Sequence, residues 1–358
     1  MTGSNPIATT ASSPGQDPIE PQPIAVYSSV SAEYEALRDR AAIVDRSHRG
    51  RMRFLGEKSG EALTGLVTND VLSLQPGHGQ YGAALSAKGR IIADIRVFAF
   101  PGYYLVDTSP RSWTGFASMV KKYVNPRVSG YRDDSFAIRD IGVFGPDARR
   151  IVAAAGQLNG DVLFALPHYG HVAATIADTP ITVARVPDAG VDGYDLFVPH
   201  DAFDRVWAAL MAVGAMPAGA SAWDIMRIEA GRPEWGVDID DSTIPQEANF
   251  DELDAISYTK GCYIGQEVVA RVHFRGHVNR HLRGLRSAKG DSGPPSGAQL
   301  IDDSGNHVGD VRSSVVSPRL GAIAIGMVRR EATPGVSLNA RWDGTTARVD
   351  VTPLPFPI

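Results

Sequence analysis

Residues 260–267 read KGCYIGQE, and this stretch contains the only cysteine among the 358 residues of the chain. Gly261 precedes the thiol and Gly265 follows it three residues later. Glycine permits positive φ angles and lets a backbone approach a ligand closely. Lys260 lies two residues before Cys262, and a neighbouring cation favours the thiolate, the reactive form of cysteine. The stretch is therefore a candidate chemical centre, although a lone cysteine is also often a small buried hydrophobe.

A short helix is expected to start directly after the thiol, at residues 265–270. The start of a helix carries a partial positive charge, which would add to the effect of Lys260 on Cys262. The flanking glycines and the lysine argue against burial of the sulfur. An accessible, reactive thiol in front of a helix and a small buried sulfur therefore both stay open.

The composition is that of a globular chain, with 43% hydrophobic and 21% charged residues. At 358 residues, two or three domains are expected. The net charge of -5 gives no overall attraction to nucleic acid or to an anionic membrane. A single cysteine cannot form an intramolecular disulfide, and the sequence has neither a signal peptide nor an apolar run of about 20 residues. We expect a cytoplasmic protein that has no membrane partner.

The chain divides into a tail, an α+β body and a β-rich end. Residues 1–25 are rich in Pro, Ser, Thr and Gln, and we expect a disordered tail. From about residue 283, short strand-like runs alternate with Gly, Pro, Asp and Ser, which is typical of a small barrel or sandwich. Between them we expect helices over 31–42 and 60–67, strands over 51–55 and 91–100, a hairpin partner over 103–106, and strands near 183 and 196.

A further helix is expected over residues 221–231, with Ser221 and Asp224 resembling a capping box and Gly231 as the stop. Glu229 interrupts the apolar stripe of this helix, which contains Ala222, Ile225 and Met226. One interpretation is a carboxylate at the helix edge that reaches solvent or an arginine. The other is a partly buried acid that binds the N–H groups of a polar ligand.

Residues 268–290 contain no Asp or Glu. Arg271, Arg275 and Arg280 give this tract a positive charge, which suits a polyglutamate tail, a phosphate or RNA, or simply a solvated face. His273, His277 and His281 follow at intervals of four, but no cysteine or carboxylate joins them and we expect no metal site. The chain also lacks a phosphate-binding Walker loop, a dinucleotide fingerprint and a serine-hydrolase elbow.

Together these segments resemble a known family. The sequence IPQEAN at 244–249, followed by KGCYIGQEVVAR at 260–271, is similar to the signature of the YgfZ family. That family is a branch of the folate-binding superfamily that includes the glycine-cleavage T-protein, an aminomethyltransferase. Residues 223–231 resemble the superfamily's folate-contacting helix, and residues 67–71 and 86–94 its N-terminal landmarks.

The resemblance covers roughly residues 27–330 and implies an α+β fold. Three domains would form a ring around a central channel that holds tetrahydrofolate, with a C-terminal β-barrel. The implied domains are residues 26–50 with 133–255 for folate, 51–132 with 256–278 for the cysteine motif, and 279–358 for the barrel.

The resemblance also implies roles for individual residues. Trp223 would flank the folate and Glu229 would accept hydrogen bonds from its pterin ring, with Asn69 and Tyr81 completing the folate site. Cys262 would be the functional thiol, with Lys260 beside it. The motif around them comprises Gly261, Tyr263, Gly265, Gln266 and Glu267.

The implied function of the YgfZ branch is a folate-dependent step in the assembly or repair of iron–sulfur proteins, including those that modify tRNA. Iron–sulfur proteins or their assembly machinery would then be partners. The T-protein has a pair of acids where this chain has Ala93 and Asp94, and it lacks the cysteine motif. The resemblance is therefore to the YgfZ branch rather than to the T-protein itself.

Two alternatives stay open. In the first, Asp94 is the catalytic acid of an aminomethyltransferase or a one-carbon demethylase. In the second, the protein is a non-catalytic RNA or protein adaptor that uses the basic tract with Arg271, Arg275 and Arg280.

Overall fold

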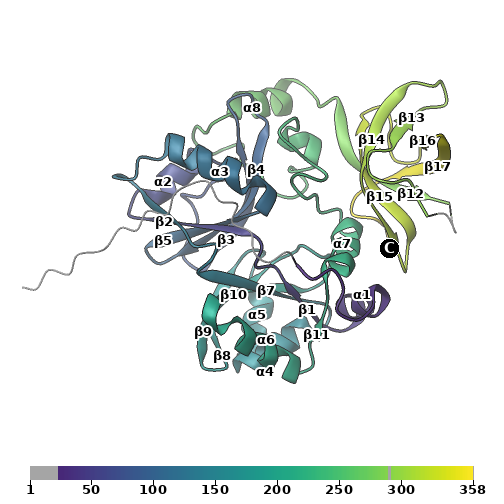
Figure 1. Cartoon of the computed structure of the whole chain (residues 1–358). Coiled ribbons are helices and arrows are strands. Elements are labelled where there is room, and N and C mark those ends of the chain that lie inside the picture. Colours follow the sequence, from purple (N-terminus) through teal and green to yellow (C-terminus); the bar gives the residue numbers. More distant parts are fainter. Residues whose placement is uncertain (1–22, 289–291, 358) are drawn as a thin grey trace, which may run out of the picture.

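The computed structural model describes residues 23–288 and 292–357. Two β-sheets and a closed barrel form three lobes, with helix α7 (Ala220–Glu229) between them (Figure 1). This confirms the expected α+β fold with a C-terminal β-barrel. The expected disordered tail, apart from residues 23–25, lies outside the described residues. The domain boundaries given above stay a prediction.

The six-stranded lobe is a mostly antiparallel sheet in the order β11-β1-β7-β10-β9-β8, in which only β1 and β11 run parallel. Apolar residues of α4 and α6 pack with the sheet in one buried cluster. The strands are β1 (Ala42–Asp45), β7 (Ile138–Phe144), β8 (His171–Ile176), β9 (Thr179–Arg185), β10 (Gly193–Pro199) and β11 (Met216–Pro217). The helices are α4 (Ala148–Gly156), α5 (Gly160–Ala165), η1 (His200–Ala202) and α6 (Phe203–Ala212).

The five-stranded lobe is an antiparallel sheet in the order β3-β4-β5-β2-β6. The predicted hairpin is confirmed: Phe100 pairs with Tyr103, and Gly102 takes the positive φ of +83° that the tight turn requires. The strands are β2 (Gly50–Leu55), β3 (Gly79–Leu85), β4 (Ile91–Phe100), β5 (Tyr103–Thr108) and β6 (Gly130–Asp133), and the helices α2 (Ser59–Thr64) and α3 (Pro110–Tyr123).

The barrel closes in the order β12-β15-β14-β13-β16-β17, with every neighbouring pair antiparallel. Closure removes the exposed sheet edges that short β-rich segments would otherwise leave. Its strands are β12 (Arg280–Ser287), β13 (Gln299–Ile301), β14 (His307–Ser317), β15 (Gly321–Arg329), β16 (Ser337–Trp342) and β17 (Thr345–Thr352).

The lobes share one apolar core, because a single buried cluster contains Leu37, Phe98, Met226 and Ile325. Leu37 lies on α1 (Val30–Asp39), which packs against α7. The remaining elements are η2 (Pro245–Ala248) and α8 (Gln266–Arg275). In the part of the chain that the structure describes, no helix is long and apolar enough to cross a membrane.

The capping box predicted at Ser221 is wrong. Helix α7 starts one residue earlier, and its N-cap is Gly219, which has no capping side chain. The buried carboxylate of Glu33 on α1 accepts the Gly219 N–H at 2.8 Å and so satisfies this helix end from outside. Asp224 instead pairs with Arg227 at 2.7 Å.

Candidate active site

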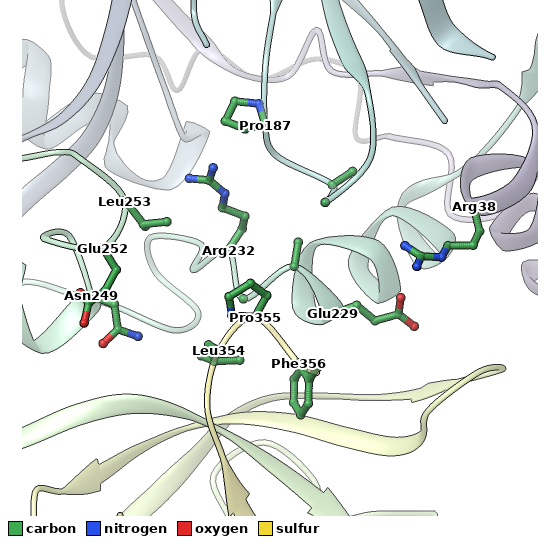
Figure 2. A pocket seen from close by; sticks show the side chains of 14 residues that line it. Arg38, Pro187, Glu229, Arg232, Asn249, Glu252, Leu253, Leu354, Pro355 and Phe356 are labelled. Carbon is green, nitrogen blue, oxygen red and sulfur yellow. The ribbon is translucent and has the colours of Figure 1, made fainter. Parts of the chain in front are cut away.

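A pocket of about 410 Å³ lies where the lobes meet. It is bounded by the end of α7, the loop at residues 187–190, residues 249–253, and the C-terminal residues 354–356 (Figure 2). Its volume falls in the range of roughly 300–1,000 Å³ typical of small-molecule sites. Because its wall combines α7, a loop of the six-stranded lobe, residues 249–253 and the end of the chain after the barrel, the pocket depends on the assembled fold.

Glu229 is buried at the rim of this pocket, where its carboxylate connects helix α1 to the barrel. Its Oε1 accepts hydrogen bonds from the Tyr34 hydroxyl at 2.9 Å and the Ser317 hydroxyl at 2.5 Å. Burial and the bond to Glu229 raise the pKa of Tyr34 to about 12, so this hydroxyl stays a donor. No described residue hydrogen-bonds to Oε2. Glu229 is thus neither a solvated edge carboxylate nor paired with an arginine; its contact with folate stays a prediction.

Arg232 is a pocket residue that the sequence analysis missed. Its side chain extends from the end of α7 toward Pro187 (Figure 2). Burial opposes its charge, yet Tyr169 and Asp188 nearby hold the pKa of the guanidinium above its ordinary value. Among the described residues no carboxylate lies within ion-pair distance. Following Gly231, the arginine looked like an exposed loop residue after a helix stop.

Asp94 on β4 is only 7% exposed. The Tyr81 hydroxyl donates to its Oδ2 at 3.2 Å, whereas its buried Oδ1 has no partner among the described residues. Burial raises the pKa of the Asp94 carboxyl, even though Arg49 opposes the shift. A buried oxygen without a partner is costly, and such groups are concentrated at functional sites.

Aromatic side chains connect Asp94 to the pocket. The ring of Tyr81 lies 6.2 Å from that of Tyr169 and 5.2 Å from that of Phe250, centroid to centroid. Phe250 directly follows the pocket residue Asn249, and the charge of Arg232 influences the pKa values of both tyrosines. Tyr81 thus links Asp94 to aromatic residues next to the pocket.

Two other predicted folate contacts have protein partners in the structure. The indole of Trp223 lies 4.6 Å from the Phe144 ring and 4.7 Å from the Arg46 guanidinium, and it does not line the pocket. The side-chain amide of Asn69 donates to the carbonyls of Tyr81 at 3.1 Å and Asp254 at 2.9 Å. Their roles toward folate stay predictions.

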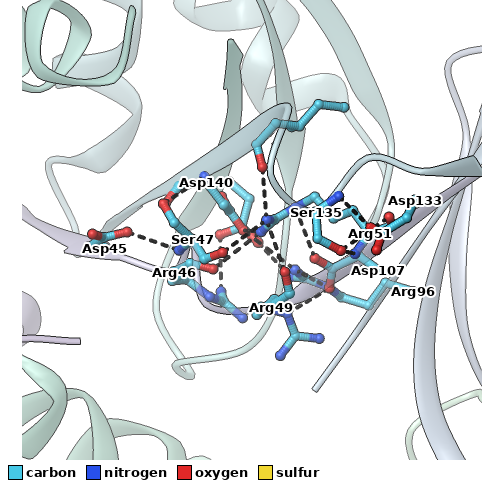
Figure 3. Close-up of polar contacts among 12 residues, drawn as sticks. Asp45, Arg46, Ser47, Arg49, Arg51, Arg96, Asp107, Asp133, Ser135 and Asp140 are labelled. Carbon is cyan, nitrogen blue, oxygen red and sulfur yellow. Dashed lines mark hydrogen bonds and ion pairs between the residues drawn. The ribbon is translucent and has the colours of Figure 1, made fainter. Parts of the chain in front are cut away.

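Arg46 belongs to a buried ion network between the two sheets (Figure 3). Arg96 on β4 contacts Asp107 at 2.7 Å and Asp195 on β10 at 2.5 Å. Arg51 on β2 contacts Asp140 on β7 at 3.2 Å. The network fixes the β4 strand that carries Asp94 against the six-stranded lobe.

The cysteine loop lies apart from the pocket. Cys262 is exposed, which excludes the buried alternative, and α8 starts at Gln266 with Gly265 as its N-cap, which confirms the helix expected after the thiol. Cys262 does not line the pocket with Glu229, and its role as the functional thiol stays a prediction.

Lys260 is bound to the backbone rather than free beside the thiol. Its ammonium donates to the carbonyls of Thr64 and of Val67, the latter at 2.8 Å, and lies 4.5 Å from the centre of the Tyr263 ring. Burial lowers the pKa of Lys260 to about 8. The lysine therefore anchors the loop to the end of α2.

The other motif residues shape the loop. The Tyr263 N–H donates to Oε1 of Gln266 at 3.1 Å, and Glu267 is exposed in the first turn of α8. Arg271 and Arg275 are exposed farther along the same helix. Arg280 lies on β12, where it pairs with Glu247 at 3.0 Å.

The chain thus has one mixed sheet, one antiparallel sheet and a closed barrel, and a pocket of small-molecule size lies between its lobes. These features define a three-lobed ligand-binding protein. The "GCVT N-terminal domain" family model matches residues 21–255, and the "Glycine cleavage T-protein C-terminal barrel domain" matches residues 280–357. The chain belongs to this glycine cleavage T-protein family.

Proteins that are similar to this chain match it over most of their length. An aminomethyltransferase of Nostoc sp. is 32% identical over 303 residues, which is 82% of this chain and 78% of that protein. An aminomethyltransferase of Halothermothrix orenii is 30% identical, covering 92% of both chains. The crystal structure of the glycine cleavage system aminomethyltransferase T from Bartonella henselae shares the fold, with a TM-score of 0.83 and 22% identity over 93% of this chain and 91% of that one.

Proposed function

We propose that the protein is a tetrahydrofolate-dependent aminomethyltransferase. The observation that carries this proposal is the buried carboxyl of Asp94, whose Oδ1 lacks a partner among the described residues. Relatives named aminomethyltransferase over 82% and 92% of the chain support it. The proposal corresponds to the first alternative of the sequence analysis rather than to its main reading.

The pocket residues fit a folate. The pocket volume of about 410 Å³ suits a ligand of the size of folate, and Glu229 offers a buried carboxylate to the N–H groups of a pterin. When bound, tetrahydrofolate supplies two nitrogens that accept the one-carbon unit, one in the pterin ring and one beside it. Glu229 and Asn249 would orient the ring, and Arg232 would attract the negative end of the ligand.

Asp94 would move the proton in this reaction. Transfer of the carbon from R–CH2–NH2 to two N–H groups of the folate breaks the R–C and C–N bonds, forms two new C–N bonds, and releases R–H and NH3. The two protons that the folate loses balance those that the two leaving groups gain. Because burial raises the pKa of Asp94, its carboxyl holds a proton more readily than an exposed one and can exchange it at Oδ1. The Tyr81 hydroxyl bonds Oδ2 and so leaves Oδ1 for the reacting group.

The test is turnover of an aminomethyl donor with tetrahydrofolate by the Asp94→Asn variant. Losing general acid–base catalysis should lower kcat by about 100-fold or more, whereas folate affinity should stay within a few-fold. Tyr81→Phe should have a smaller effect, and Cys262→Ser none. Unchanged turnover by Asp94→Asn would refute the proposal. Sarcosine and dimethylglycine as alternative donors would reveal a demethylase.

A second candidate is the YgfZ-type role in maintaining iron–sulfur proteins, including those that modify tRNA. The exposed thiol of Cys262 within the KGCYIGQE motif favours it, and both roles suit a cytoplasmic protein. The measurement is iron–sulfur enzyme activity in a deletion strain complemented with each variant. Rescue by Asp94→Asn but not by Cys262→Ser would favour this role; the reverse result would favour aminomethyl transfer.

A further inference from the structure

Two opposite charges face each other at one end of the pocket between the lobes. Arg38 on α1 and Glu229 at the end of α7 both line the pocket, and their side chains point toward one another (Figure 2). The two groups nevertheless form no ion pair, and Arg38 has no hydrogen-bond partner among the described residues. This end of the pocket therefore presents a cation and a carboxylate that are both available to a ligand.

The carboxylate of Glu229 is held in place by one of its two oxygens. The hydroxyls of Tyr34 and Ser317 donate to Oε1 at 2.9 and 2.5 Å, so the carboxylate cannot turn without losing both hydrogen bonds. Oε2 accepts no hydrogen bond from any described residue. Because a carboxylate that is taken out of water needs donors for both oxygens, Oε2 is an acceptor position for an N–H group of a ligand.

Arg38 reaches the pocket from the same face of α1 as Tyr34, which it follows by four residues. Burial raises the pKa of Tyr34, and the charge of Arg38 opposes this effect, which shows that the guanidinium lies near the hydroxyl. Within one helical turn the acidic residues are Glu35, which pairs with Arg40 at 3.5 Å, and Asp39. Neither pairs with Arg38, so its N–H groups stay available as donors.

The other charged residues that line the pocket, within the described ranges, lie away from this end. The side chain of Arg232 extends toward Pro187, and Glu252 lies beside Asn249 on the opposite side (Figure 2). The recognition chemistry at this end is thus one fixed acceptor facing one charged donor. A ligand edge that carries a donor next to an acceptor is complementary to this pair.

We propose that Arg38 and Glu229 bind the edge of a pterin ring and that Arg38 determines specificity for its ring carbonyl. This proposal rests on the proposed function. Along that edge an amino group and a ring N–H are donors, and the adjacent carbonyl oxygen is an acceptor. Oε2 of Glu229 accepts from the donors, and the Arg38 guanidinium donates to the carbonyl. Hydrogen bonds to charged groups are the stronger kind, and a compound that cannot form them leaves both side chains unpaired.

The test compares the affinities of the full chain for tetrahydrofolate and for the analogue in which an amino group replaces the ring carbonyl. The analogue lacks both the carbonyl acceptor and the adjacent ring N–H, so we expect tetrahydrofolate to bind about 100-fold tighter. Arg38→Leu should weaken tetrahydrofolate binding about tenfold without weakening that of the analogue, which reduces the preference to about tenfold or less.

Two further variants separate recognition from charge and from folding. Arg38→Lys keeps the charge and one donor direction but not the planar fork, so it should lose less of the preference than Arg38→Leu. Arg40→Leu is the matched control, because Arg40 directly follows the same helix and does not line the pocket. This control should keep the full preference.

Equal affinities for the two compounds in the unchanged protein would overturn this proposal, and turnover with tetrahydrofolate would leave the proposed function standing. An undiminished preference in Arg38→Leu would also overturn it. If tetrahydrofolate neither binds nor supports turnover, both proposals fail. Guanosine carries the same amino, N–H and carbonyl edge on a different ring. If guanosine bound as tightly as tetrahydrofolate, the pocket would be a purine site and the pterin proposal would be wrong.

Discussion

Two buried carboxylates, Glu229 and Asp94, show what single residues contribute. The apolar stripe of α7 singled out Glu229 as either an edge carboxylate or a partly buried acid, and the structure buries it. Its partners Tyr34 and Ser317 lie 195 and 88 residues away along the chain, and no local pattern identifies them. The free Oδ1 of Asp94 likewise depends on packing between distant strands.

His48 should make stability depend on pH. Burial and the neighbouring Arg49, Arg46 and Arg51 lower its pKa to about 3, and its Nδ1 is buried without a partner among the described residues. Because the folded pKa lies below the ordinary value of about 6.5, the unfolded chain binds a proton at His48 more readily than the folded chain does. The free energy of unfolding is therefore unaffected by this group above pH 6.5 and falls as the pH drops from 6.5 toward 3.

The free energy of unfolding should therefore fall less steeply between pH 6 and 4 in the His48→Gln variant than in the unchanged protein. The two slopes should differ by at most about 1.4 kcal/mol per pH unit, and by less because water partly reaches the ring. Urea unfolding at several pH values measures these slopes. Parallel curves for His48→Gln and the unchanged protein would contradict the prediction.

At the scale of elements, the cysteine loop depends on one backbone conformation. Gly265 caps α8 with φ of +82°, and a Cβ there would lie 2.5 Å from the Ser86 carbonyl oxygen. Gly261 in the same loop has open space around it. Of the two glycines of the motif, only Gly265 is thus required by its backbone angle and its close neighbours, and their spacing in the sequence does not reveal this difference.

Replacing Gly265 by alanine should lower the free energy of unfolding by about 2–3 kcal/mol, since strained φ and a backbone clash combine. Gly261→Ala is the matched control and should change it little. Urea denaturation measures both variants. Reaction of Cys262 with a thiol reagent should also change in Gly265→Ala, because α8 no longer fixes the loop. Equal stability of the two variants would show that the loop adapts.

Elements with strong local signals were predictable, and those fixed by neighbours were not. The hairpin of β4 and β5 follows from β-branched runs on either side of Pro101-Gly102. The start of α7 was misplaced because Glu33, on another helix, satisfies its first N–H. The Trp223 side chain was expected at folate, but Arg46 and Phe144 contact its ring.

At the scale of the whole molecule, charged residues as well as apolar ones hold the two sheets against each other. Asp107 and Asp195 come from different sheets, and Arg96 lies between them fully buried. Sequence patterns treat such residues as surface groups, because Arg and Asp are rarely buried unless paired. The resemblance to a known family was therefore needed to predict the arrangement of lobes.

Arg96→Met should destabilise the whole chain by up to about 3–5 kcal/mol, because it removes the cation shared by Asp107 and Asp195 and leaves these buried carboxylates with fewer partners. Arg96→Lys should lose less, since it keeps the charge but not the fork that reaches both aspartates. Arg150→Ala, in an exposed pair with Asp147, should leave the unfolding midpoint unchanged. Because β4 carries Asp94, folded Arg96→Lys should also show lower kcat at unchanged folate affinity. Full activity together with full stability in Arg96→Met would mean that apolar packing alone holds the sheets together.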